Sequence, residues 1–127
     1  IFTQFILKSM VKKKSGSIIY ISSSASLDGN EGRSSYAASK AALNAQAKVL
    51  SRELGGVNIR VNTIAPGLTN TDMMSKNTTE KAIEETLSKV SMRRLAKPEE
   101  IAKVALFLSS DISIYLTCQF IRVDEKI

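Results

Sequence analysis

Apolar positions recur along this chain with spacings that alternate between those of helices and those of strands. In residues 1–14 they stand three and four apart, as on one face of a helix, and lysines occupy the last turn. Residues 17–21 are a short, β-branched and almost continuous apolar run, and residues 57–64 are a second one. Such runs are typical of strands buried on both faces of a parallel sheet, so we expect two buried strands here.

The segments between and after these runs complete the alternation. Their polarity, their alanine content and their glycine or proline breakers distinguish loops from helices. The resulting order of helices and strands predicts an α/β fold with a parallel sheet. We expect a loop at 22–35, a helix at 35–54, a loop with one or two short helices at 70–91, a helix at 98–109 and a strand at 120–123.

Length and composition agree with a soluble domain. The chain has 127 residues, of which 43% are hydrophobic and 24% charged. No apolar run approaches the roughly 20 residues that span a bilayer, so we expect no membrane partner and no signal peptide. The single Cys118 leaves no intrachain disulfide, which indicates a reducing, cytoplasmic compartment.

The absence of histidine and the net charge narrow the possible chemistry. Without histidine the chain has no His-activated nucleophile, no His general base and few options for zinc, so we expect no metal site. The net charge is +6, and its densest cluster is Lys12–Lys14. No aromatic residues accompany that cluster, so we interpret it as a solvated helix end and expect no nucleic acid. An anionic ligand or partner is the alternative.

Tyr36 and Lys40 are candidate catalytic residues because they stand four apart near the start of the predicted helix 35–54. That spacing places both side chains on one helix face. A phenol, with a usual pKa of about 10, is a poor proton shuttle at neutral pH, but a neighbouring cation and the positive end of a helix both stabilise its phenolate. An exposed tyrosine beside a solvated lysine would explain the pair equally simply if it stood alone.

Two further features are expected at the same edge of the sheet. Ser23 follows the first buried strand, and Pro66-Gly67 ends the second. Active sites of open parallel sheets lie outside the carboxyl ends of the strands. A serine hydroxyl there can hydrogen-bond a substrate carbonyl oxygen, and a glycine lets a flat ring approach the backbone. A polar strand end and a plain turn are the alternatives for these residues taken singly.

These residues lie in a sequence that resembles the short-chain dehydrogenase/reductase family. The similarity covers nearly the whole chain and keeps the family's motifs in order and spacing. It looks nearest to the β-ketoacyl-acyl-carrier-protein reductase type, with sugar and alcohol dehydrogenases as close alternatives. The motifs are Ile21-Ser22-Ser23, Tyr36–Leu43, Arg60–Gly67 with Thr71-Asp72-Met73, Arg94–Ala102 and Phe107–Asp111.

The resemblance implies hydride transfer between a nicotinamide cofactor, NAD or NADP, and a small carbonyl or secondary alcohol substrate. It implies that Tyr36 is the general acid/base, that Lys40 stabilises its phenolate and binds the nicotinamide ribose, and that Ser23 polarises the substrate carbonyl. Residues 70–91 would form a lid that selects the substrate together with the loop Ser24–Ser35. The cofactor-binding residues so implied are Tyr36, Lys40, Pro66, Gly67, Thr69 and Thr71.

The chain departs from the family at both ends. Its six glycines form neither G-x-G-x-x-G nor G-x-x-x-G-x-G, the patterns that hold a pyrophosphate at a helix N-terminus. The resemblance therefore implies that residues 1–127 are a single partial domain, the C-terminal half of a Rossmann-like doubly wound parallel sheet without its N-terminal nucleotide-binding half. Near the other end, Cys118 and Glu125-Lys126 stand where the family usually has glycine, which predicts backbone strain.

Two interpretations of this chain follow. In the first it is the catalytic half of a reductase whose N-terminal half is a missing partner, and the chain alone is inactive and has no useful affinity for a nicotinamide cofactor. In the second it is a non-catalytic truncated remnant that acts as an oligomerisation or interaction module. In both, we expect a homo-oligomer formed through the helices at 1–14 and 35–54.

Overall fold

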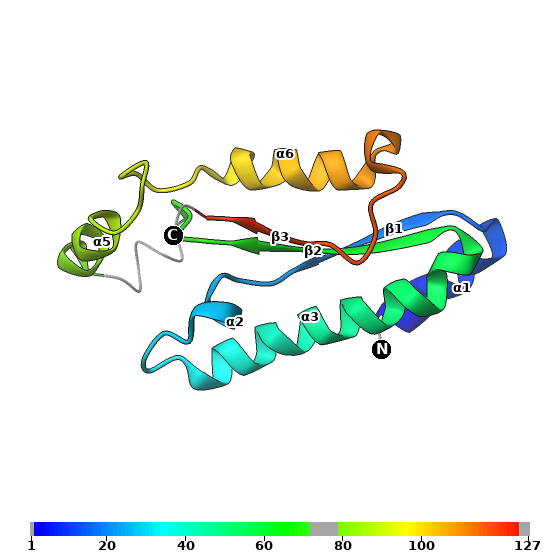
Figure 1. The fold of residues 1–127 in the computed structure, drawn as a ribbon, viewed down its shortest axis with the longest axis horizontal. Coiled ribbons are helices and arrows are strands. Elements are labelled where there is room, and N and C mark those ends of the chain that lie inside the picture. The colour runs from blue at the N-terminus through cyan, green and yellow to red at the C-terminus, as the bar shows by residue number, and fades with distance from the viewer. Residues whose placement is uncertain (1, 72–78, 125–127) are drawn as a thin grey trace.

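The computed structural model describes residues 2–71 and 79–124 and has an α/β architecture (Figure 1). Helices and strands alternate as the sequence predicts. The elements are α1 (Phe2–Lys13), β1 (Gly16–Ile21), α2 (Ala25–Asp28), α3 (Ser34–Leu54), the 3-10 turn η1 (Gly55–Val57), β2 (Ile59–Pro66), α5 (Glu80–Leu87), α6 (Pro98–Ser109), the 3-10 turn η2 (Asp111–Ser113) and β3 (Phe120–Val123).

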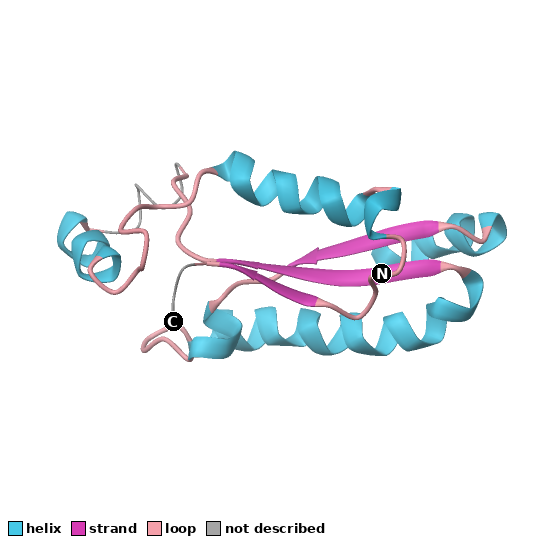
Figure 2. Cartoon of the chain, turned by 45° about the horizontal axis from the view of Figure 1, so that its top comes forward, coloured by secondary structure: helices cyan, strands magenta, loops and turns pink. Residues whose placement is uncertain are grey.

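The three described strands form one parallel sheet in the order β1-β2-β3. Ile21 of β1 lies beside Ile64 of β2, and Pro66 of β2 lies beside Val123 of β3. Figure 2 shows α6 on one face of this sheet and α3 on the other. The carboxyl ends of all three strands therefore meet at one edge, where α2, the start of α3 and α5 also lie (Figure 1).

The core is centred on β2. The side chains of Ile59, Val61 and Ile64 are fully buried because this strand has a neighbour on each side and a helix on each face. Ala47 and Leu54 of α3 pack against it. The sequence-based prediction of a strand buried on both faces is thus confirmed for β2.

The same prediction is wrong for β1. Its residues are half-buried, and Ile21 is exposed. Within the described part of the chain, β1 pairs with β2 alone and is an edge strand, so one side of it has no strand to cover it.

Two boundaries also differ from the sequence-based prediction. The second strand begins at Ile59 rather than residue 57, because Gly55–Val57 forms a 3-10 turn and Asn58 takes a left-handed conformation with φ of 59°. The polar segment 22–35 contains the single turn α2, which ends at Gly29 with φ of 65°. One helical turn has no apolar periodicity, so the pattern gave no sign of it.

The loop between η2 and β3 is attached to β2 by buried polar side chains. The fully buried Asn62 donates from Nδ2 to the Leu116 carbonyl (2.8 Å) and accepts from the Gln119 N–H (2.9 Å). Arg60 of β2 donates to the Leu116 carbonyl in this loop (3.5 Å) and to the Leu108 carbonyl at the end of α6 (2.8 Å). Cys118 has a backbone φ of 62°, so the strain expected at this position is present.

Replacing Asn62 should therefore destabilise the fold strongly. The Asn62→Leu variant removes both hydrogen bonds of the buried amide and leaves the Gln119 N–H without its Asn62 partner, which is expected to lower the free energy of unfolding by ~2–4 kcal/mol. Urea denaturation followed by circular dichroism measures this change. Gln46→Leu, an amide replaced on the exposed side of α3, is the matched control and should change it by less than about 0.5 kcal/mol.

Glu100 links α6 to the segment before it. Its carboxylate accepts hydrogen bonds from the Arg94 guanidinium (2.7 and 2.8 Å) and from the Lys97 N–H (2.7 Å). The hydrogen bond from Arg94 and that from Lys97 lower the pKa of Glu100 from an ordinary 4.5 to about 2.

This pKa predicts how the start of α6 responds to acid. Because the folded-state pKa is the lower one, the stabilising contribution is complete above about pH 4.5 and is lost as the pH falls towards 2. An NMR titration of the Glu100 carboxyl carbon should give a midpoint near 2 in the native chain. The Arg94→Met variant should titrate closer to 4.5, and an identical midpoint in both would contradict the assignment.

Candidate functional site

Backbone hydrogen bonds bring the ends of the three strands together at one rim of the sheet. The Ser22 N–H donates to the Ile64 carbonyl (2.8 Å), and the Ser24 N–H donates to the Pro66 carbonyl (3.0 Å). The Gly67 N–H donates to the carbonyl of Val123 (3.0 Å). Ser23 and the Pro66-Gly67 turn therefore lie at the same rim, as the sequence predicts.

Tyr36 and Lys40 reach this rim from the first turns of α3. The Lys40 Nζ lies 5.8 Å from the centre of the Tyr36 ring, so the two side chains share a helix face as predicted. Lys40 Nζ also donates to the carbonyl of Ile21 (3.0 Å), the last residue of β1. Tyr36 itself is open to solvent and is 43% exposed. The cation is thus fixed between the strand end and the phenol ring.

Ser23 is half-buried in the turn between β1 and α2. Its Oγ accepts the Ala25 N–H (3.2 Å), and its carbonyl accepts the Ser26 hydroxyl (2.6 Å). The preceding Ser22 is buried and donates from Oγ to the Lys40 carbonyl (3.0 Å). Among the described residues no hydrogen bond joins Ser23 directly to Tyr36, and the connection runs through Ser22 and the backbone of α3.

The other residues proposed for cofactor binding follow β2. Gly67 has Asp124 close against it, since a Cβ on Gly67 would lie 2.5 Å from the Asp124 Cβ. The Thr69 hydroxyl donates to the Gly67 carbonyl (3.2 Å), and the Thr69 backbone pairs with Ala96. Thr71 is exposed at the end of this segment. Asp72 and Met73, which belong to the same motif, lie outside the described residues.

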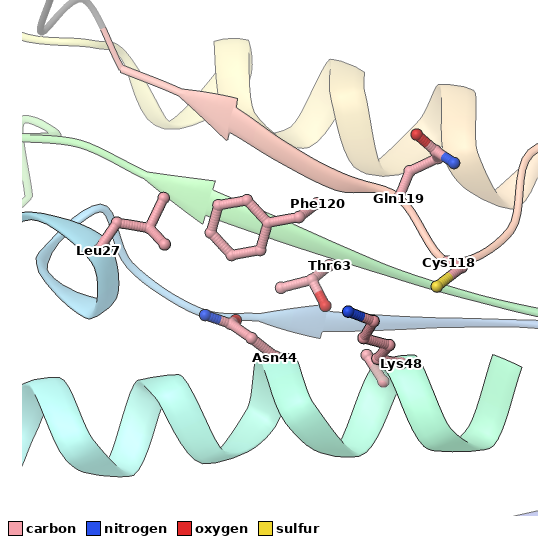
Figure 3. A pocket seen from close by; sticks show the side chains of 8 residues that line it. Leu27, Asn44, Lys48, Thr63, Cys118, Gln119 and Phe120 are labelled. Carbon is pink, nitrogen blue, oxygen red and sulfur yellow. The ribbon is translucent and has the colours of Figure 1, made fainter.

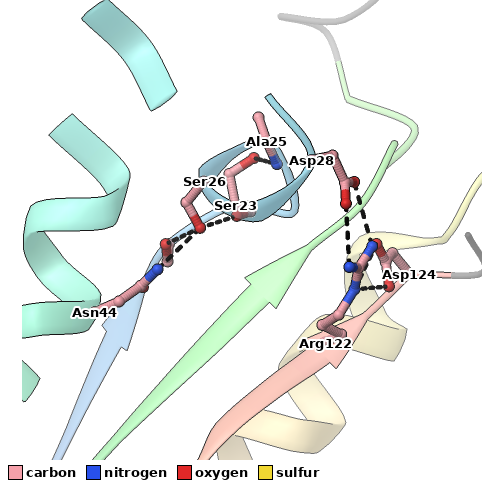
Figure 4. Close-up of polar contacts among 8 residues, drawn as sticks. Ser23, Ala25, Ser26, Asp28, Asn44, Arg122 and Asp124 are labelled. Carbon is pink, nitrogen blue, oxygen red and sulfur yellow. Dashed lines mark hydrogen bonds and ion pairs between the residues drawn. The ribbon is translucent and has the colours of Figure 1, made fainter. Parts of the chain in front are cut away.

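Sequence reasoning missed a charged cluster at this rim, which Figure 4 shows. Arg122 of β3 contacts Asp28 at the end of α2 and Asp124 beyond β3. The hydrogen bonds from Arg122 to Asp124, and then to Asp28, raise the pKa of Arg122 above its ordinary value. The Arg-x-Asp pattern at 122–124 was the available signal, but Asp28 is 94 residues away and no spacing rule connects it.

Two cavities lie elsewhere than at the predicted catalytic residues. One of about 300 Å³ opens between α3 and β3 (Figure 3). Its lining includes Asn44, whose Oδ1 is buried without a hydrogen-bond partner. A second cavity of about 330 Å³ is lined by residues of α5 and the segment that follows it. Neither is lined by Ser23, Tyr36 or Lys40, so we place the candidate site on the open rim itself.

The described residues hold no group of three His, Cys, Asp or Glu side chains that could bind a metal ion. No helix in residues 2–71 and 79–124 is long and apolar enough to cross a membrane.

Comparison with known proteins identifies the family. Residues 2–125 match the family model described as enoyl-(acyl carrier protein) reductase. The chain is 47% identical over 122 residues to the 3-oxoacyl-[acyl-carrier-protein] reductase FabG of Thermotoga maritima, and 48% identical over 119 residues to that of Chlamydia trachomatis. These matches cover 96% and 94% of this chain but 49% and 48% of the relatives, so the chain spans about half the length of the curated proteins it matches.

A solved structure agrees with this assignment. A structure from Beutenbergia cavernae described as an NAD(P)-dependent gluconate 5-dehydrogenase, with NADP bound at low occupancy, superposes with a TM-score of 0.88 at 31% identity. The superposition covers 93% of this chain and 48% of that one. The three-stranded sheet described above thus matches part of a Rossmann fold. The chain belongs to the short-chain dehydrogenase/reductase family of oxidoreductases and is FabG-like within it.

Proposed function

We propose that this chain supplies the catalytic half of an NAD(P)-dependent oxidoreductase that reduces a carbonyl to a secondary alcohol. The observation that carries the proposal is the Tyr36–Lys40 pair, which meets Ser23 and the Pro66-Gly67 turn at one rim. The names of the FabG relatives favour a 3-oxoacyl thioester as the carbonyl substrate. A sugar substrate is the alternative, supported by the gluconate 5-dehydrogenase neighbour.

Tyr36 is proposed as the group that donates a proton to the substrate oxygen. Its hydroxyl is on an exposed side chain, within reach of a ligand on the rim. The positive charge of Lys40, held 5.8 Å from the ring centre, stabilises the phenolate that remains after proton transfer. Because Lys40 is also bound to the Ile21 carbonyl, it keeps this position without any ligand.

Ser23 is proposed as the donor that polarises the substrate carbonyl. Its oxygen accepts the Ala25 N–H, so its own hydrogen remains available for the substrate oxygen. Partial negative charge develops on that oxygen as the carbonyl is reduced. A hydroxyl fixed in place before the reaction stabilises this charge more than a mobile one would.

The rim fits the nicotinamide end of the cofactor, which supplies the hydride when bound. We propose that Pro66, Gly67, Thr69 and Thr71 line the nicotinamide, and that Tyr36 and Lys40 bind its ribose. Their hydroxyl, ammonium and backbone groups suit the carboxamide and the ribose hydroxyls. The described residues contain no glycine-rich turn at a helix start that would bind the diphosphate. We therefore propose that this part is held by a second, nucleotide-binding half, and whether the cofactor is NAD or NADP depends on it.

Self-association is proposed as a second property of the chain. Phe5 of α1 is 83% exposed and Val49 of α3 is 55% exposed, although both are large and apolar. Exposed apolar groups on neighbouring helices favour a contact with another chain. This supports a homo-oligomer formed through α1 and α3, and it is the feature that would remain if the chain were a non-catalytic interaction module.

Tyr36→Phe should abolish turnover while leaving cofactor binding intact. The assay uses a chimera in which this chain is joined to the unmatched half of the Thermotoga maritima relative, with NADPH and an acetoacetyl thioester. Loss of the proton donor is expected to lower kcat by at least about 100-fold, whereas the NADPH dissociation constant from fluorescence titration stays the same. Tyr115→Phe, at a fully solvated tyrosine, is the control and should retain activity.

Retained turnover in Tyr36→Phe would remove Tyr36 from its proposed role. A folded chimera that binds NADPH and reduces no carbonyl would instead favour the interaction module. The 127-residue chain alone is expected to show no micromolar affinity for NADPH in the same titration.

Charged substitutions on α1 and α3 should dissociate the proposed oligomer. The double variant Phe5→Glu/Val49→Glu is expected to be monomeric by light scattering coupled to size exclusion, because it buries two carboxylates in any such interface. Leu106→Glu places the same charge on α6, at the opposite face of the sheet, and should leave the assembly unchanged. Equal dissociation in the control would assign the association to another surface.

A further inference from the structure

We propose that Arg122 is a positioning residue for Ser23, through the segment Ser22–Asp28, which we call the serine segment. The inference rests on the proposed function, in which Ser23 polarises the substrate carbonyl. It concerns a side chain on β3 that touches neither the proposed substrate nor the proposed cofactor position. Figure 4 shows the residues involved.

The beginning of the serine segment is held by its neighbours on both sides. The N–H groups of Ser22 and Ser24 donate to carbonyls of β2, as described above. On the other side, Asn44 of α3 donates from Nδ2 to the Ser26 Oγ (2.9 Å). These contacts hold the segment up to residue 26, and α2, which ends it, is only one turn long.

Arg122 holds that far end. Its Nη1 and Nη2 lie 3.1 and 3.3 Å from the two carboxylate oxygens of Asp28, which is the paired geometry that an arginine fork provides. Asp28 is the last residue of α2, and Gly29 follows with a left-handed backbone. This ion pair connects the end of the segment to β3.

Arg122 is itself held in place by Asp124. The Arg122 Nε lies 2.9 Å from Asp124 Oδ1, and a second contact joins Nη2 to Oδ2. The Asp124 side chain is 6% exposed and packs against Gly67. The Arg122 guanidinium is therefore held through Asp124 by the turn at Gly67, which we propose to line the nicotinamide. The same guanidinium binds Asp28, so it connects that turn to the serine segment.

Removal of the Arg122 guanidinium should change the position of α2 relative to β3. Asp28 and Asp124 would then be two carboxylates without the cation between them, and their repulsion would move the end of α2 away from β3. The rest of the one-turn helix would follow, since the Asp28 N–H donates to the Ser24 carbonyl (3.1 Å) and the Ser26 N–H donates to the Ser23 carbonyl (3.0 Å). Small displacements of a group that contacts the reacting atoms lower kcat strongly.

Hydrogen–deuterium exchange on the full 127-residue chain tests the anchoring without cofactor or turnover. Mass spectrometry reads peptide exchange in monomers and assemblies alike. In Arg122→Met, amides in residues 22–29 should exchange at least about fivefold faster than in the native chain. Arg122→Lys, which keeps the charge but not the fork, should lie between the two.

Arg94→Met is the matched control, because it removes another exposed Arg–carboxylate pair. It should speed exchange at the start of α6 and leave residues 22–29 unchanged. Unchanged exchange at 22–29 in Arg122→Met would overturn the inference, as would an equal acceleration in the control.

Kinetics in the chimera described above test whether the anchor acts through Ser23. Asp28→Asn should lower kcat about tenfold with little change in KM. In a Ser23→Ala background, Asp28→Asn should cause no further loss, because the group that it positions is gone. An equal tenfold loss in both backgrounds would overturn the positioning role.

The two tests separate failure of this inference from failure of the proposed function. If the chimera turns over and Ser23→Ala has no effect, the role of Ser23 is wrong and the positioning role falls with it. If the chimera has no activity at all, the proposed function fails, and accelerated exchange in Arg122→Met then supports the anchor while unchanged exchange overturns it.

Discussion

Parallel pairing of β2 with a neighbour on each side is the constraint on which the rest of the structure depends. In a parallel sheet the carboxyl ends of adjacent strands end at one edge, and here the register places Ile21 beside Ile64 and Pro66 beside Val123. Groups that follow different strands, and lie far apart in the sequence, therefore meet. The buried Asn62 of β2 fixes this register, because a slip would separate its side chain from the Leu116 carbonyl and the Gln119 N–H.

The position of α3 brings the side chains of Tyr36 and Lys40 to this edge. The helix crosses one face of the sheet and packs its alanine and leucine side chains on β2, so its first turns lie at the edge where the strands end (Figure 1). Tyr36 and Lys40 are in those turns. The hydrogen bond from Lys40 to the Ile21 carbonyl then ties the helix to the end of β1. One packing interaction thus determines both the core and the location of Tyr36 and Lys40, the proposed proton-transfer pair.

The sequence predicted the parts of this arrangement that depend on local pattern. Helical and strand periodicity placed α1, α3, α6 and β2 to within about two residues, and the tyrosine–lysine spacing predicted a shared face. The pattern did not predict α2, because one turn has no period. It did not predict the Arg122–Asp28 pair either, because tertiary structure alone brings these two residues together.

The catalytic and the non-catalytic interpretations place different demands on the rim. An interaction module built on α1 and α3 needs apolar side chains on those helices, and it needs nothing from the first turns of α3 or from the turn after β1. Yet polar contacts at the rim are extensive: Lys40 is fixed beside an exposed phenol, Ser22 binds the backbone of α3, and Arg122 joins two carboxylates next to Gly67. Fold stability alone does not require a half-exposed tyrosine beside a cation that is tied to a strand end. An ordered set of polar groups around an accessible phenol is what proton transfer requires, so the arrangement favours the catalytic interpretation.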